Sequence, residues 1–442
     1  MSFDKTRDTT AFIPDNGAEL RDAPMSSESL IPEPARRRSS PAARSALIVL
    51  ACVVALSVPL QVHFVRNLSP DVHSDLYSPW MGTRALLHHV DPYSPTLTAR
   101  IQGDMYGHPL APGDPHDPEA FVYPPWVAFP LAPFTFVAWP SVEWLFAILT
   151  PLVILATLWA WMRFCTPGFA RAASVAICVL VLACWPAVWG CYQRQPSLFV
   201  IAAIAFSLLL FRQARDVASG ILLALATVKP QLVLLIAAWL FALALGHRRW
   251  RFVTSFLASL ASLVGASALL FPGSIMHWIH AAIAYTHAAG KVSLLTHLLG
   301  PRLGLFADLA LLAALGLRLW KLLPSSSDTP AFVNAAALIL AVTTCLIPGN
   351  AWLLFNNLLL VPAVLLLFSL PAGTQFPQLL QTLAGLALLL ALLVTPICAG
   401  IGALTGYRFD LVMPPFLLNY LLPIPLTAAF FFFLPAANQM PE

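Results

Sequence analysis

The sequence predicts an all-α polytopic membrane protein. Of its 442 residues, 59% are hydrophobic and 10% are charged, and the mean hydropathy is +0.78. A soluble domain carries roughly 25% charged residues and cannot bury so much apolar surface in one core. In lipid the backbone satisfies its hydrogen bonds only within helices or a closed barrel. The apolar runs are long and continuous rather than alternating, which favours helices over a barrel.

The apolar runs predict about ten to twelve transmembrane helices, because each crossing needs about 20 residues. The expected ranges are 45–65, 143–163, 172–189, 196–212, 216–228, 230–246, 252–271, 303–320, 331–347, 352–370, 378–398 and 415–435.

The membrane domain is expected over residues 45–435, between a tail of 1–44 and a short tail of 436–442. Charge, Pro and Ser in residues 1–44 predict a disordered cytoplasmic tail without a recognisable signal peptide. Residues 66–121 form a large polar first outer loop. Residues 122–140 contain five prolines, so this segment is interpreted as re-entrant or interfacial.

The basic residues predict how the chain crosses the membrane. With a cytoplasmic amino terminus and a non-crossing 122–140, 16 of the 24 Lys and Arg lie inside, in agreement with the positive-inside rule. The same rule makes 216–246 a hairpin that turns at Lys229-Pro230-Gln231. Lys229 then lies inside the bundle, at a depth where polar residues mark substrate pathways. We expect a multi-pass protein of the cytoplasmic (inner) membrane.

Polar groups from five segments are expected to meet on the outer half of the bundle, which is the pattern of a site. They are the acidic outer loop with Asp71, Asp75, Asp91 and Asp104, the stretch 121–125, the loop 192–195, the hairpin turn 229–231 and the turn 348–350.

Each candidate residue has a structural interpretation beside the functional one. Asp75 could be a general base for a hydroxyl, or a loop acid or helix N-cap. Lys229 could bind a phosphate or extend from a helix end to the interface, and Arg194 leaves the same two alternatives. Gln195 and Gln231 could bind sugar hydroxyls or satisfy the backbone of a broken helix.

Nothing in the sequence demands a metal or cofactor. The seven cysteines form no CxxC pair, so neither a disulfide framework nor a zinc site is indicated. Nucleotide-binding motifs are lacking, and the net charge of +4 is too small and scattered to indicate nucleic acid. The histidines of the segment 272–302 match no standard ligand spacing and are interpreted as interfacial: His277, His280, His287 and His297.

The order and spacing of several motifs resemble glycosyltransferase family 87, the polyprenol-phosphate-sugar-dependent enzymes with a membrane-embedded GT-C fold. The resemblance runs through most of the membrane part. The residues that carry it are Ser74-Asp75-Leu76-Tyr77, the run 82–87 with Arg84, Asp91-Pro92-Tyr93, Tyr123-Pro124-Pro125, Gln195 with Ser197-Leu198, and the run 220–226 leading to Lys229-Pro230-Gln231 and the basic 248–251.

This resemblance implies that a sugar, a hexose such as mannose, moves with inversion from a polyprenyl-phosphate donor to a lipid- or glycan-linked acceptor on the outer face. The family's catalytic acid falls on Asp75 as general base. Lys229 and Arg194 would stabilise the departing polyprenyl phosphate. The expected pocket and substrate-binding residues are Gln195, Gln231, Tyr123, Tyr77, Arg84, Tyr93 and Asn350.

Two departures from the family pattern leave a different donor or acceptor, or a less active member, open. The chain has Arg194-Gln195-Pro196 where the family often has Gly-Gln. It has Asn356-Asn357 before Pro362 where an aromatic residue with His or Asp is common, and an amide cannot act as a base.

A transporter or flippase of a lipid-linked or small polar substrate is the alternative, since broken helices and buried polar groups also mark transporters. The large acidic loop and the absence of a visible repeat favour the enzyme. A purely structural membrane protein is the third possibility, against which the buried Lys229 speaks.

Overall fold

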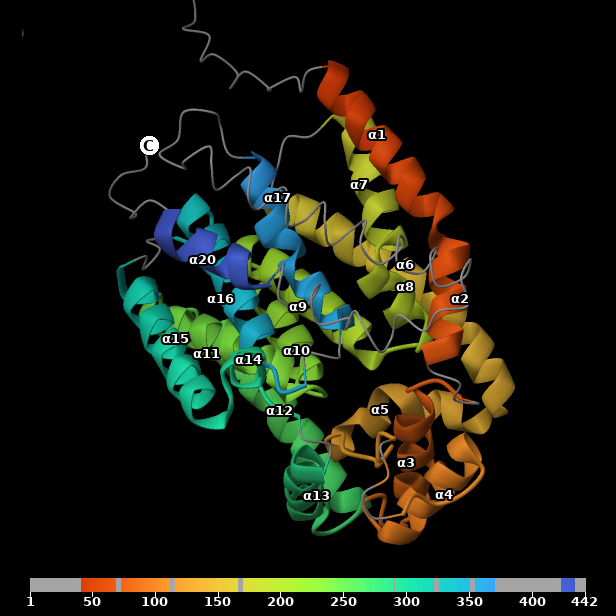
Figure 1. Cartoon of the computed structure of the whole chain (residues 1–442). Coiled ribbons are helices and arrows are strands. Elements are labelled where there is room, and N and C mark those ends of the chain that lie inside the picture. Colours follow the sequence, from red (N-terminus) through yellow and green to blue (C-terminus); the bar gives the residue numbers. More distant parts are fainter. Residues whose placement is uncertain are drawn as a thin grey trace, which may run out of the picture. The chain divides into compact units, whose positions relative to one another are not determined.

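The computed structural model describes residues 41–68, 73–111, 114, 116–165, 170–288, 291–321, 326–349, 354–369 and 423–433. Within these ranges all regular structure is helical (Figure 1), which confirms the all-α class. The predictions for residues 1–40, for the span 378–398, for the tail 436–442, and for Asp71 and Asn350 lie outside the described residues.

The helices follow one another in short pieces, many of which begin at a proline. In chain order they are α1 (Pro41–Leu56), α2 (Val58–Leu68), α3 (Tyr77–Leu87), α4 (Pro95–Tyr106), η1 (Pro125–Val127), α5 (Ala128–Leu131), η2 (Ala132–Phe136), α6 (Trp139–Cys165), α7 (Arg171–Ala183), α8 (Trp185–Tyr192), α9 (Pro196–Arg212), α10 (Asp216–Ala226), α11 (Pro230–Gly246), α12 (Trp250–Leu270), α13 (Ser274–Ala288), α14 (Leu294–Leu299), α15 (Pro301–Lys321), α16 (Pro330–Leu346), η3 (Leu354–Leu360), α17 (Val361–Ser369) and α20 (Pro423–Phe433).

Several helices are long and apolar enough to cross a membrane, which supports a multi-pass protein. In the described part of the chain, four qualify: Ser45–His63, Trp139–Cys165, Trp250–Leu270 and Pro301–Trp320. A fifth is added if α7 and α8 form one bent span. Five more apolar helices are only 10–17 residues long. In the described part of the chain, these five helices are shorter than the roughly 20 residues of a complete crossing, so fewer full-length spans are found there than the expected ranges suggested.

The expected span 172–189 is divided into α7 and α8, whose axes differ by 54°. The backbone becomes extended at Cys184, and Pro186 occupies the first turn of α8. Proline lacks the N–H that would bond to Leu182, and its ring clashes with that carbonyl. The helix therefore ends and starts again in a new direction.

The hairpin turn predicted at Lys229 is confirmed, since α10 ends at Ala226 and α11 begins at Pro230. The loops at the far ends of these two helices are joined by Arg249. Its Nε donates to Asp216 Oδ1 at 3.0 Å and its Nη1 donates to Ser327 Oγ at 3.0 Å. The basic loops before α10 and after α11 therefore share one end of the bundle, as the hairpin requires.

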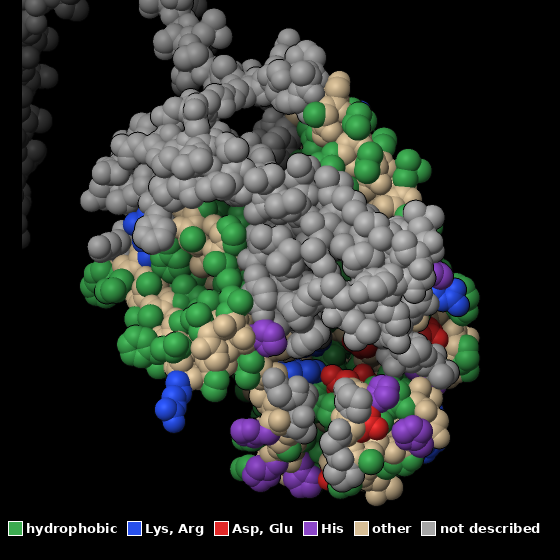
Figure 2. Space-filling model, viewed as in Figure 1, with side chains coloured by type: hydrophobic (Ala, Val, Ile, Leu, Met, Phe, Trp, Pro, Cys, Tyr) green, Lys and Arg blue, Asp and Glu red, His purple; other side chains and the backbone are tan. Residues whose placement is uncertain are grey.

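The opposite end of the bundle is covered by the outer loop and α13. In Figure 1, α3, α4 and α5 lie together there beside α13. The interval 122–140 forms η1, α5 and η2 instead of a continuous helix. Around it, aromatic side chains pack into a core of their own that includes Trp80, Phe121, Trp139 and Phe146. Figure 2 shows largely hydrophobic side chains on the described surface of the bundle and histidines at the α13 end.

Candidate active site

A cavity of about 290 Å³ lies where the outer loop, the start of α9, the turn between α10 and α11, and α13 meet. Figure 2 shows acidic and basic side chains side by side between the bundle and the α3–α5 group. The polar side chains that line the cavity are Asp75, Ser78, Asp117, Glu119, Tyr123, Gln195, Lys229, Gln231, Trp278, Tyr285, Thr286 and Lys291.

Two X-Pro steps place polar side chains in the cavity. Gln195 precedes Pro196, the first residue of α9, and Lys229 precedes Pro230, the first residue of α11. A residue before proline is driven out of the α region, and proline is favoured at the first helical position. The chain therefore turns at Gln195 and Lys229, and their side chains extend beyond the helix ends.

A hydrogen-bonded chain joins Asp75 to Lys229. Gln195 Nε2 donates to Asp75 Oδ2, and Gln195 Oε1 accepts from Lys229 Nζ at 3.3 Å. Lys229 Nζ also donates to Ser197 Oγ at 2.8 Å. The amide thus separates the carboxylate from the ammonium group while bonding to both, and Gln195 is only 2% exposed.

Two aromatic rings lie near the ammonium group of Lys229. Its Nζ lies 5.2 Å from the ring centroid of Tyr123 and 5.7 Å from that of Phe355, within the range of cation–π attraction. Among the described residues Lys229 forms no ion pair. Its charge is therefore available to an anion that enters the cavity.

A second lysine, which sequence reasoning missed, lies on another wall of the cavity. Lys291 Nζ donates to Asp117 Oδ2 at 2.8 Å and to the Tyr285 hydroxyl at 2.6 Å. The Tyr285 hydroxyl donates to Asp117 Oδ1 at 2.6 Å. A sequence signal did exist, because Lys291 is the only Lys or Arg between Arg251 and Arg302.

The pKa values in this cluster follow from burial and charge. Burial acts to raise the pKa of Asp117, but the charge and hydrogen bond of Lys291, together with the Tyr285 hydroxyl, outweigh it and hold that pKa below its usual range. Burial, and then the charge of Asp117, raise the pKa of Tyr285 well above its ordinary value. The cluster is therefore a charged pair with a neutral tyrosine.

Tyr93, another expected site residue, does not line the cavity but supports its wall: its hydroxyl donates to the backbone oxygen of Tyr123 at 2.8 Å. Trp278, which does line the cavity, donates from Nε1 to the backbone oxygen of Val122 at 3.1 Å. Arg194 does not line the cavity. It has a left-handed backbone, with φ of 48°, and its guanidinium folds back to donate to the Tyr192 carbonyl.

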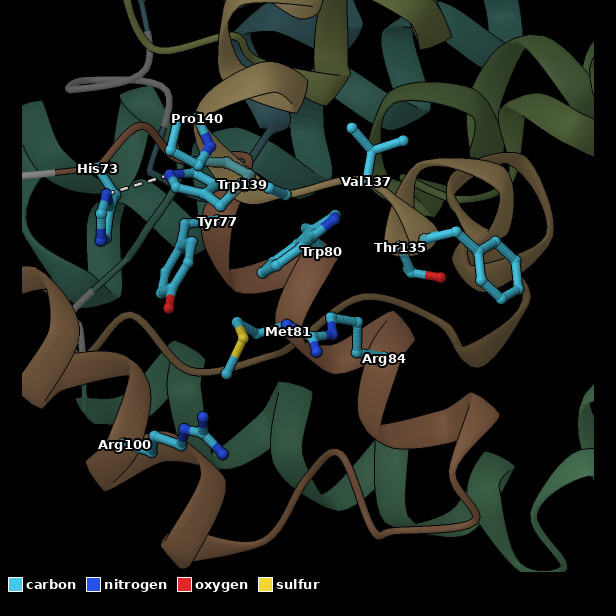
Figure 3. A pocket seen from close by; sticks show the side chains of 12 residues that line it. His73, Tyr77, Trp80, Met81, Arg84, Arg100, Thr135, Val137, Trp139 and Pro140 are labelled. Carbon is cyan, nitrogen blue, oxygen red and sulfur yellow. Dashed lines mark hydrogen bonds between the residues drawn. The ribbon is translucent and has the colours of Figure 1, made fainter.

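Tyr77 and Arg84, expected at the same site as Asp75, line a different cavity (Figure 3). The helical repeat explains the separation. Tyr77 and Arg84 are seven residues apart in α3 and share a face, whereas Ser78 lies on the face that lines the first cavity.

The described residues contain no group of three or more His, Cys, Asp or Glu placed to share a metal ion. Asn356 is buried within η3, 2% exposed, and among the described residues its Oδ1 has no hydrogen-bond partner.

The comparison with known proteins gives one match. The sequence pattern of glycosyltransferase family 87 matches residues 121–369, more than half of the chain. The matched part includes Gln195, Lys229 and Lys291, while Asp75 lies before it. No curated protein and no solved structure matches the chain significantly. The chain belongs to glycosyltransferase family 87, and it is a membrane glycosyltransferase.

Proposed function

We propose that this enzyme transfers a hexose such as mannose from a polyprenyl-phosphate donor to a hydroxyl of a lipid- or glycan-linked acceptor, on the outer face of the cytoplasmic membrane. The observation that carries the proposal is the arrangement in one cavity of a carboxylate, Asp75, and two ammonium groups, Lys229 and Lys291. Glycosyl transfer from a lipid phosphate needs both a proton acceptor and positive charge for the departing phosphate.

In the proposed reaction the acceptor oxygen attacks the anomeric carbon from the face opposite the phosphate. The new carbon–oxygen bond forms as the bond to the phosphate oxygen breaks, so the configuration inverts. Asp75 takes the hydroxyl proton, and the bonding electrons leave with the polyprenyl phosphate. Gln195 is a positioning residue, because its amide holds the Asp75 carboxylate in place.

Lys229 is proposed to bind the donor phosphate. Its ammonium group has no carboxylate partner among the described residues, and a charge-assisted bond to phosphate strengthens as negative charge develops on the leaving oxygen. Lys291 is already paired with Asp117, and this carboxylate offsets part of the positive potential that Lys291 would otherwise supply to the donor phosphate. Tyr123 and Gln231 line the same cavity and are proposed to contact the sugar.

The proposal is tested by following radiolabelled sugar from polyprenyl-phosphate mannose, glucose or arabinose into lipid extracts. Membranes bear the wild-type protein, Asp75→Asn, or Asp328→Asn as matched control. Asp328 is 81% exposed and pairs with Arg212, so its isosteric amide should not alter transfer. We expect transfer by wild type and Asp328→Asn only. If Asp75→Asn still transfers sugar, Asp75 is not the general base. If intact donor moves across the membrane and no sugar is transferred, the protein is a transporter.

A further inference from the structure

A second cavity among the described residues is separate from the candidate active site. It has a volume of about 520 Å³ and is lined by His73, residues of α3, Arg100 of α4, and the segment 135–140. Figure 3 shows the rings of Tyr77, Trp80 and Trp139 on one side of it, with Arg84 and Arg100 approaching from the other.

The guanidinium groups make this cavity electropositive. Among the described residues neither Arg84 nor Arg100 forms an ion pair. The Arg84 guanidinium carbon lies 4.8 Å from the Trp80 ring centroid, a stacking that leaves its N–H edge available. The nearby carboxylate of Asp104 accepts from the Tyr77 hydroxyl at 2.7 Å. The two guanidinium groups can therefore both donate to a phosphate, because the one nearby carboxylate already accepts a hydrogen bond from Tyr77.

His73 adds a further donor at the edge of the cavity. Trp139 Nε1 donates to His73 Nδ1 at 3.1 Å, which is the dashed line in Figure 3. A neutral imidazole that accepts at Nδ1 carries its proton on Nε2. The His73 ring is therefore left with an N–H to offer to an anion.

The cavity adjoins the first residues of a candidate membrane span. Trp139 and Pro140, which line it, are the first two residues of α6, a candidate membrane span. Tryptophan is enriched at the level of lipid headgroups. At the cavity edge, the side chain of Phe136 is 87% exposed and that of Val137 is 43% exposed. Acyl chains can pack against an apolar edge of this kind, whereas a soluble anion makes no favourable contact with it.

We propose that this cavity binds the phosphate headgroup of an anionic membrane lipid, with Arg84 and Arg100 on the phosphate and Phe136 against the chains. The bound headgroup lies next to the catalytic segment, because His73 and Tyr77 line this cavity while Asp75 and Ser78 line the other. The proposal concerns binding and does not rest on the proposed sugar transfer.

The test is titration calorimetry of the purified full-length protein in neutral detergent with short-chain dihexanoyl phosphatidic acid. Dihexanoyl phosphatidylcholine and inorganic phosphate are titrated in parallel. Each titration is repeated with Lys229→Met, which removes a cation of the active-site cavity that has no ion-pair partner among the described residues. The variants are Arg84→Gln and Arg100→Gln. The matched control is Arg163→Gln, because Arg163 also lies over a tryptophan, 5.8 Å from the Trp159 ring centroid.

We expect saturable phosphatidic acid binding that survives Lys229→Met and weakens about tenfold or more in each pocket variant, the loss typical of a hydrogen bond between charged groups. Arg163→Gln should bind like wild type. Unfolding curves check that the variants are folded, which is expected because both arginines are exposed. Binding unaffected by both pocket variants overturns the site, as does equal binding of phosphatidylcholine. Equal binding of inorganic phosphate shows a free-ion site and overturns the lipid assignment, and loss in Lys229→Met alone places the lipid in the active-site cavity.

Discussion

Gln195 donates its side-chain amide to the carboxylate of Asp75, although 120 residues separate the two in the sequence. The oxygen of the same amide accepts from Lys229, so the orientation of the amide is fixed from both sides. The proposed base and the proposed phosphate-binding cation are thereby held at a set separation. Neither neutralises the other through direct contact, which leaves each able to act on a different substrate.

Replacing Gln195 should reduce turnover more than donor binding. In Gln195→Leu the Asp75 carboxylate loses its orienting donor, and we expect kcat to fall about tenfold to a hundredfold, since small misplacements of a catalytic group cost rates of this order. The donor KM should change little while Lys229 keeps its bond to Ser197. Steady-state kinetics in detergent measures both. Gln193→Leu is the control, a buried amide two residues earlier that does not line the cavity. An unchanged kcat in Gln195→Leu would contradict the positioning role.

Removing the charge of Lys229 should lower kcat/KM for the sugar donor. Lys229→Met approximately keeps the length of the side chain but removes its charge. We expect kcat/KM to fall about tenfold or more, which corresponds to the roughly 1.5–3 kcal/mol of a hydrogen bond to a charged group. Lys229→Arg should retain part of the activity. Arg302→Met serves as control, because Arg302 is exposed and does not line the cavity. If Lys229→Met leaves kcat/KM at the wild-type value, the phosphate binds elsewhere.

The Asp117–Lys291 pair should stabilise the folded protein in a pH-dependent way. The pKa of Asp117 is lowered in the folded state, so its contribution is present above the unfolded pKa of about 3.9 and is lost as pH falls through the lower folded value. We expect Asp117→Asn to melt at a lower temperature than wild type at about pH 6 to 7, because this range lies well above the reference pKa of an aspartate. The difference should shrink below about pH 4. Melting curves across this range provide the measurement, and a difference that stays constant into acid would exclude the ion pair as its cause.

Gly82 should tolerate no side chain. A Cβ built on Gly82 would overlap the ring of Phe121, which is 1% exposed. Gly82→Ala therefore forces α3 away from the segment that carries Tyr123, at a cost of about 1–3 kcal/mol for overpacking. The matched control is Gly103→Ala in α4, where nothing lies within 4 Å of the added carbon. A lower melting temperature in Gly82→Ala alone is expected, and Gly82→Ala/Phe121→Leu should restore part of it.

Local sequence patterns were sufficient for the helical class and for the hairpin at Lys229. They did not reveal the bend within 172–189, where a uniformly apolar run contains Pro186. The family resemblance also grouped Tyr77 and Arg84 with Asp75 in one pocket, whereas they line the second cavity. The periodicity of α3 would have separated them, because residues seven apart share a helix face that Ser78 does not.

The sequence by itself determined the membrane environment, the family, the collection of basic loops at one end of the bundle and the X-Pro steps that turn the chain at Gln195 and Lys229. These depend on composition and on neighbouring residues, which local physics fixes. Only the tertiary structure decided that Gln195 meets Asp75, that Lys291 meets Asp117, and that a second cavity adjoins the first. The two side-chain contacts join residues more than 100 positions apart. Such partners are selected by the packing of whole helices rather than by any pattern along the chain.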